Sequence, residues 1–134
     1  MAESQPKKSL AEMVADAKGR IENLTVEQVA SELNGGNVIL IDVRDDDQRS
    51  QDGAIPNSVS APSVSGMLEF WADPTSAYHR EPFDPARRTI LYCTAGGRAA
   101  LATDTLQKMG YGNVANLDGG IKAWKEGGHP VEEA

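Results

Sequence analysis

Cysteine is almost absent from this sequence, because among its 134 residues only Cys93 is a cysteine. A single cysteine cannot form a disulfide within the chain, which agrees with a reducing compartment. Long apolar runs are also missing: no segment approaches the roughly 18 apolar residues that a membrane span requires, and the first ten residues contain no apolar stretch resembling a secretion signal. We therefore expect a cytoplasmic protein with no membrane partner.

Positive charge is scarce relative to negative charge, with 13 Lys and Arg residues against 20 Asp and Glu residues and a formal net charge of −7 at pH 7. Such a surface repels nucleic-acid backbones, so we expect no nucleic-acid partner. The remaining composition, 40% hydrophobic and 25% charged residues, is typical of a soluble globular protein. A chain of 134 residues can bury one core but is too short for two ordinary domains.

Histidine is rare as well. The two histidines, His79 and His129, do not have the spacing of metal ligands to each other or to the cysteine, so the sequence predicts neither a metal site nor a cofactor. The acidic run at residues 45–47 is the other candidate cation site. We interpret it instead as a solvated turn.

The N-terminal part of the sequence contains two helix starts. Ser9 and Glu12 have the spacing of a capping box, and the apolar residues that follow predict an additional N-terminal helix over residues 9–20. Thr25 and Gln28 repeat the same signal. They predict a second helix, which ends at a pair of glycines.

Strands and helices alternate through the rest of the sequence. Apolar and extended runs predict strands at residues 38–41, 54–61, 89–92 and 114–117. Helical spacing of apolar residues predicts one helix over residues 98–109 and a last short helix around residues 121–124. This alternation is typical of an α/β fold with a mainly parallel central sheet flanked by helices.

The segment from Cys93 to Arg98 carries the strongest functional signal. It follows a predicted buried strand and opens a predicted helix, so it lies where open α/β sheets place their ligand crevice. The N-terminus of a helix presents free N–H groups, which favour the nucleophilic thiolate. Gly96 and Gly97 allow successive amides to turn toward one anion. A lone cysteine is more often a small buried hydrophobe, but two adjacent glycines suit an anion site better than a packing site.

Three motifs, in this order, resemble the rhodanese family. They are Asp42-Val43-Arg44, the segment from Cys93 to Ala102, and the segment from Asn116 to Trp124. The resemblance covers residues 21–131 and points to single-domain bacterial members. It implies a rhodanese-like fold with a five-stranded sheet, and the activity of a thiosulfate sulfurtransferase-like enzyme.

The resemblance also implies a mechanism and a set of site residues. Cys93 would take a sulfane sulfur from a donor such as thiosulfate or a persulfide, hold it as a persulfide, and pass it to a thiophilic acceptor such as cyanide or a thiol. No cofactor is implied. Donor and acceptor could be small molecules or proteins, and the sequence leaves this open. The persulfide would be cradled by the backbone amides of Thr94, Ala95, Gly96, Gly97 and Arg98.

On this basis we divide the chain into a disordered tip at residues 1–8, the additional helix at residues 9–20, and a rhodanese-like domain at residues 21–134. The apolar face of the additional helix could fold onto the domain, dock onto a partner, or form a homodimer. The sequence does not decide between these.

Two further groups of residues are candidates for supporting roles. By resemblance, Asp42 is an acceptor that orients the active loop and Arg44 is a neighbouring cation, although a surface salt bridge is an equally open reading of Arg44. The insertion at residues 66–85 contains four of the seven aromatic residues. Within it, Phe70 and Trp71 could form a wall of the Cys93 pocket, or the aromatic residues could pack on the core.

Two other functions compete with sulfur transfer. Related folds of cysteine phosphatases and arsenate reductases also place a cysteine and an arginine at the ends of an anion-binding loop. Here four residues separate Cys93 from Arg98, and the phosphatase loop is one residue longer, which makes room for a tetrahedral oxyanion. Arsenate reduction also calls for further thiols, which this chain lacks. A non-catalytic sulfur-carrier or interaction module is the remaining alternative.

Overall fold

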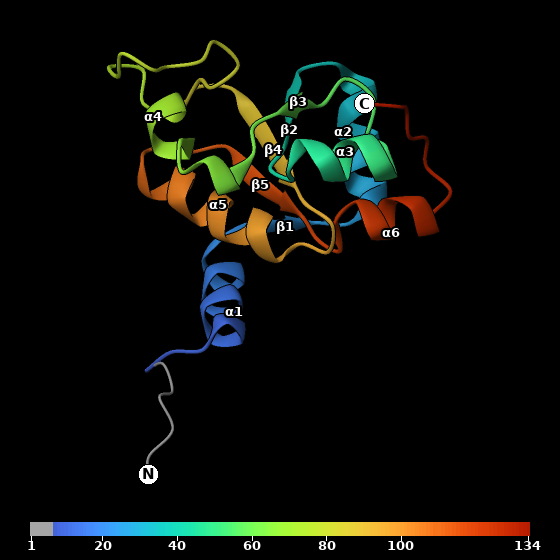
Figure 1. Cartoon of the computed structure of the whole chain (residues 1–134), viewed down its shortest axis with the longest axis horizontal. Coiled ribbons are helices and arrows are strands. Elements are labelled where there is room, and N and C mark those ends of the chain that lie inside the picture. The colour runs from blue at the N-terminus through green and yellow to red at the C-terminus, as the bar shows by residue number, and fades with distance from the viewer. Residues whose placement is uncertain (1–6) are drawn as a thin grey trace.

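The computed structural model describes residues 7–134, so most of the predicted tip at residues 1–8 lies outside the described residues. A five-stranded sheet, entirely parallel, forms the centre, with the strand order β1-β5-β4-β2-β3 (Figure 1). The predicted α/β fold with a five-stranded sheet is confirmed. The strands are β1 (Glu22–Leu24), β2 (Val38–Asp42), β3 (Val59–Ser60), β4 (Arg88–Tyr92) and β5 (Val114–Leu117).

Helices cover both faces of this sheet (Figure 1). Two separate hydrophobic clusters fill the spaces between helices and sheet: one contains Leu68, Phe83 and Leu106, and the other, on the opposite face of the sheet, contains Val29 and Trp124. The helices are α1 (Leu10–Arg20), α2 (Val26–Gly35), α3 (Asp46–Asp52), α4 (Leu68–Ala72), α5 (Gly97–Lys108) and α6 (Gly120–Glu126), with a short 3-10 helix, η1 (Ser63–Ser65).

The burial of strands β2 and β4 explains why their sequences are continuously apolar. In β2, Leu40 belongs to one cluster and Ile41 to the other, and in β4 the same holds for Ile90 and Leu91. Successive side chains of a strand point to opposite faces, so both faces of these strands are buried. The prediction of parallel strands buried on both sides is confirmed.

Both predicted capping boxes are present. The Ser9 hydroxyl accepts a hydrogen bond from the amide of Glu12 at 3.1 Å, and the Glu12 carboxylate accepts one from the amide of Ser9 at 3.0 Å. Thr25 and Gln28 form the same reciprocal pair at the start of α2. Each box satisfies amides that would otherwise lack a partner in the first helical turn.

The structure differs from the sequence-based expectation at three places. Strand β1 was not predicted, because its first two residues, Glu22 and Asn23, are exposed and carry no apolar signal. The acidic run at residues 45–47 begins helix α3, with Asp45 as its N-cap, instead of forming a turn; carboxylates near a helix N-terminus interact favourably with the helix dipole. The extended piece predicted at residues 54–61 contains only the two-residue strand β3.

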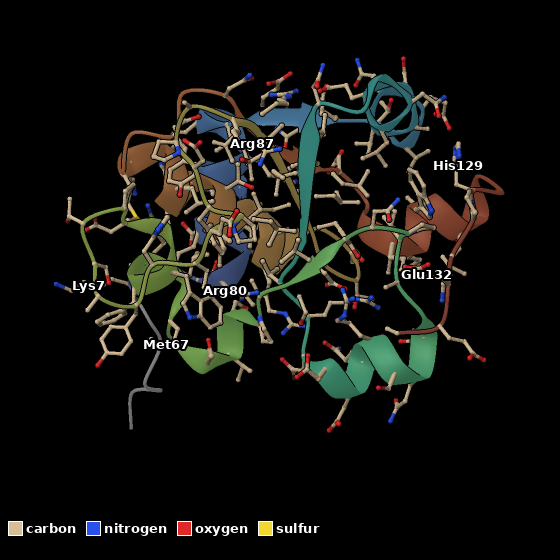
Figure 2. The ribbon with its side chains drawn as sticks, turned by 90° about the horizontal axis from the view of Figure 1, so that it is seen from above. Lys7, Met67, Arg80, Arg87, His129 and Glu132 are labelled. Carbon is tan, nitrogen blue, oxygen red and sulfur yellow. The ribbon has the colours of Figure 1, made fainter. Side chains whose placement is uncertain are left out.

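The C-terminal segment closes one end of the domain. Ala54 and Glu132 form an isolated antiparallel bridge, and the ring of His129 stacks on Trp124 with the ring centres 4.5 Å apart. Figure 2 shows His129 and Glu132 along this segment, on the opposite side of the molecule from Met67 and Arg80. Within residues 7–134, no helix has the length and apolar character needed to cross a membrane.

Candidate active site

Cys93 lies at the carboxyl end of the central strand β4, which has β5 on one side and β2 on the other. It directly follows the last residue of β4, and helix α5 begins four residues later at Gly97. Cys93 is only 3% exposed. The thiol is therefore held at the crevice edge of the sheet, at the base of a short loop that opens a helix.

Two backbone amides point at this sulfur, one from the loop and one from the first turn of α5. Of the amides predicted to form the cradle, from Thr94 to Arg98, Gly96 is the one that donates to Sγ, and Ala99 was not predicted. The amide of Gly96 donates to Cys93 Sγ at 3.1 Å, and the amide of Ala99 donates at 3.4 Å. Gly96 has φ +108°, in the left-handed region that glycine adopts without strain. N–H groups aimed at the sulfur are hydrogen-bond donors for negative charge, so this geometry is suited to hold an anion attached to the sulfur.

A second segment fixes the outer side of this loop. The amide of Ile121 donates to the carbonyl of Cys93 at 2.9 Å, and the amide of Lys122 donates to the carbonyl of Thr94 at 3.1 Å. Because helix α6 binds the carbonyls from outside, it helps hold the loop in the orientation that turns its amides inward.

Gly120 allows this close approach. It has φ +62°, and a Cβ atom built there would lie 2.5 Å from the carbonyl oxygen of Cys93 and closer still to that of Thr94. Sequence reasoning used this segment only for the resemblance and assigned Gly120 no role. The available signal was the pair of glycines that precedes a short helix.

Arg98 lies at the rim of the site. Its guanidinium donates to the side-chain oxygen of Gln48 at 2.8 Å and contacts the carboxylate of Asp45 at 3.4 Å, and its side chain is 40% exposed. Both partners come from the start of α3. Arg98 thus supplies a cation beside Cys93, and Asp45 neutralises part of its charge.

Asp42 and Arg44 form a buried ion pair. Both side chains are 0% exposed and their charged groups are 2.8 Å apart, so the surface salt bridge considered for Arg44 is wrong. Burial alone would lower the pKa of Arg44, but the hydrogen bonds and charge of Asp42 raise it above its usual value. In the described part of the chain, Asp42 accepts from Arg44 and Arg49 and not from the Cys93 loop. It therefore orients the segment after β2 and not the loop itself.

Tyr92 connects this ion pair to the neighbouring segment. The Arg44 guanidinium lies over its ring, 5.6 Å from the centroid, and its hydroxyl accepts from the amide of Ile55 at 3.1 Å and pairs with Ser58. Burial raises the pKa of the Tyr92 hydroxyl. The phenol thus stays neutral, and this network anchors the strand residue immediately before Cys93.

A cavity of about 300 Å³ opens above Cys93. Two of its walls come from α1 and α5, and the base comes from the loop. The lining residues are Leu10, Val14, Cys93, Thr94, Ala95, Gly97, Arg98 and Leu101. Its volume is at the lower end of the range for small-molecule sites.

The structure does not place Phe70 or Trp71 in this cavity. Phe70 is 49% exposed and meets Tyr78 edge to face, while Trp71 packs against Phe83 and under the guanidinium of Arg80. The insertion covers a different part of the domain, where Tyr111 donates a hydrogen bond to a backbone carbonyl at the end of α4. Of the two readings left open for the aromatic residues, packing on the core holds for Trp71 and Phe83, and the cavity wall is provided by α1.

The sequence model of the Rhodanese-like domain family matches residues 25–127 of this chain. The chain belongs to the rhodanese-like domain family. A curated relative, described as a sulfurtransferase, from Allochromatium vinosum is 32% identical over 94 residues, which make up 70% of this chain and 78% of that protein.

Solved structures also resemble this rhodanese-like domain. A protein of unknown function from Rhodopseudomonas palustris, described as a possible tyrosine phosphatase, is 36% identical with a TM-score of 0.90, covering 98% of this chain and 100% of the other. The homodimeric polysulfide-sulfur transferase of Wolinella succinogenes is 27% identical with a TM-score of 0.69, covering 90% and 85%. Helix α1 lies outside the residues matched by the family, so the rhodanese-like domain here has one cavity wall from an additional element.

Proposed function

We propose that this rhodanese-like domain is a sulfurtransferase that carries sulfane sulfur as a persulfide on Cys93. The observation that supports this most directly is the pair of amides, from Gly96 and Ala99, that donate to Cys93 Sγ at the base of an open cavity. Fixed N–H donors stabilise charge that develops on sulfur without having to reorganise during the reaction.

The reaction has two displacements. The Cys93 thiolate attacks the outer sulfur of a donor such as thiosulfate; a new S–S bond forms, and sulfite leaves with the electron pair of the broken S–S bond. A nucleophilic acceptor such as cyanide then attacks the terminal sulfur of the persulfide, thiocyanate leaves, and the thiolate is restored. No proton has to be transferred in either step, so the site needs no general base. The loop amides and Arg98 hold the anions in place.

The persulfide can be tested by intact-protein mass spectrometry. Treatment of the wild type with thiosulfate, or separately with a polysulfide, is expected to add the mass of one sulfur atom, and subsequent cyanide is expected to remove it. Protein alkylated on Cys93 beforehand is the matched control and should gain nothing. Equal sulfur uptake by the alkylated protein would contradict the proposal, and no uptake by the wild type would favour an interaction module.

Phosphate hydrolysis is the second candidate, because one similar structure is described as a possible tyrosine phosphatase. Four residues between Cys93 and Arg98 give a short loop, and the amides of Gly96 in this loop and of Ala99 in α5 already point at the sulfur. We expect no hydrolysis of an aryl phosphate and no reduction of arsenate by the pure wild-type protein. Turnover of either substrate, absent from alkylated protein, would overturn the assignment to sulfur transfer.

A further inference from the structure

Helix α1 is attached to the domain by its C-terminal end. The Arg20 guanidinium forms two hydrogen bonds to the carboxylate of Asp104, at 3.0 and 2.8 Å, and the Gln107 side chain donates to the carbonyl of Arg20. Hydrogen bonding to Arg20 lowers the pKa of Asp104, so this pair stays charged at neutral pH. Lys18 adds an ion pair to Asp118 at 3.0 Å. These contacts hold α1 beside α5, as Figure 1 shows.

The part of α1 nearer its N-terminus forms a wall of the Cys93 cavity. Leu10 and Val14 line the cavity from one side, and Leu101 of α5 lines it as well. Val14 reaches the loop closely, since a Cβ atom built on Gly97 would lie 3.8 Å from its methyl group. An entering molecule therefore meets aliphatic side chains before it meets the sulfur.

The cavity offers little compensation for a multiply charged anion. Of the eight lining residues only Arg98 carries a permanent charge, which Asp45 partly neutralises. Lys18 is the next cation, close to Gly96, and it is already paired with Asp118. A thiosulfate dianion would lose hydration at the aliphatic walls. Beyond the amides of Gly96 and Ala99 at the sulfur, its second charge would gain only the one cation that Arg98 shares with Asp45, which is unfavourable. An anion with one charge and an apolar tail would lose less hydration free energy, and burying its tail would contribute favourable free energy.

We propose that α1 selects the sulfur donor: Leu10 and Val14 favour singly charged organic donors in which the sulfane sulfur is attached to a group with an apolar tail, such as alkanethiosulfonates, over thiosulfate. This rests on the proposed sulfur transfer by Cys93. In the reaction, the Cys93 thiolate attacks the sulfane sulfur of R–SO₂–S⁻. The bond from that sulfur to the sulfonyl sulfur breaks, and the sulfinate R–SO₂⁻ leaves with the electron pair.

The test compares donors that share one reacting group and differ only in tail length. Initial rates with cyanide as acceptor give kcat/KM for methanethiosulfonate, propanethiosulfonate and thiosulfate. Burial of two additional methylene groups predicts a kcat/KM about tenfold higher for the propane donor than for the methane donor. The double variant Leu10→Ser/Val14→Ser should bring this ratio close to one. Met13→Ser, on the same helix but outside the cavity lining, should keep it about tenfold.

The outcomes separate this inference from the function on which it rests. The role of α1 would be overturned, while sulfur transfer stands, if all donors are turned over and tail length has no effect on kcat/KM. It would also be overturned if Leu10→Ser/Val14→Ser leaves the effect of tail length unchanged. Failure of every donor to load Cys93 in the wild type would overturn both. Circular dichroism of the double variant checks that the domain is folded, and the ratio of two donors on one protein is independent of the fraction of active enzyme.

Discussion

Replacing Cys93 with serine is expected to abolish sulfur transfer, leaving no turnover above the rate measured without enzyme. A serine hydroxyl is nearly isosteric with the thiol but stays protonated at neutral pH and forms no stable bond to sulfane sulfur. Because the chain has no other cysteine, no second thiol can take over. Steady-state formation of thiocyanate from thiosulfate and cyanide measures the loss.

The fold should survive Cys93→Ser, since the change is small and the amides of Gly96 and Ala99 can donate to a hydroxyl oxygen as they do to sulfur. Thermal unfolding of the two proteins should therefore differ little. Residual turnover in a folded Cys93→Ser protein would show that another group on the chain carries the sulfur.

Gly120→Ala is expected to reduce kcat/KM for sulfur transfer by at least about a hundredfold, since misplacement of a reacting group by about 1 Å can cost that much. The new methyl group would meet the carbonyl oxygens of Cys93 and Thr94 at distances that no Cβ tolerates, so the loop and α6 must separate. The amides of Ile121 and Lys122 would then lose the two carbonyls they bind, and the loop amides would no longer converge on the sulfur.

Gly128→Ala is the matched control, because Gly128 also has a positive φ, +79°, but is exposed and has no atom within 4 Å of a built Cβ. It should retain wild-type turnover. If Gly120→Ala is less stable, alkylation and intact mass at a temperature where it stays folded still report whether Cys93 accepts sulfur. A folded Gly120→Ala variant with wild-type turnover would show that the contact with α6 does not position the loop.

The features that could be predicted from the sequence are those set by neighbours along the chain. The Ser9 and Thr25 capping boxes depend on residues three positions apart, and the buried strands β2 and β4 depend on runs of apolar residues. The Cys93 loop was located for the same reason, since the end of a strand, the two glycines and the start of a helix are consecutive.

What could not be predicted depends on packing between distant segments. That α1, and not the aromatic insertion, forms a cavity wall depends on the contact between Arg20 and Asp104, which lie 84 positions apart in the sequence. The full burial of Arg44 depends on the segment at Gly53, whose carbonyl accepts from its guanidinium at 2.7 Å. Strand β1 forms because it pairs with β5, whereas its own three residues do not have the sequence pattern of a strand.

The position of β1 also determines the order in which the protein can assemble during synthesis. This strand pairs with β5, and the two ends of the chain meet again where Asn116 donates to Asn23, 93 positions away, and where Lys18 contacts Asp118, 100 positions away. A ribosome delivers the N-terminal segment first, so α1 has no docking surface until α5 has emerged, and β1 has no partner strand until β5 has emerged. The α1 segment, which forms one cavity wall, is thus translated well before α5, the helix on which it docks. Nascent chains released before residue 118 would contain Cys93 and both helical walls of its cavity, but not α6, whose amides bind the carbonyls of Cys93 and Thr94.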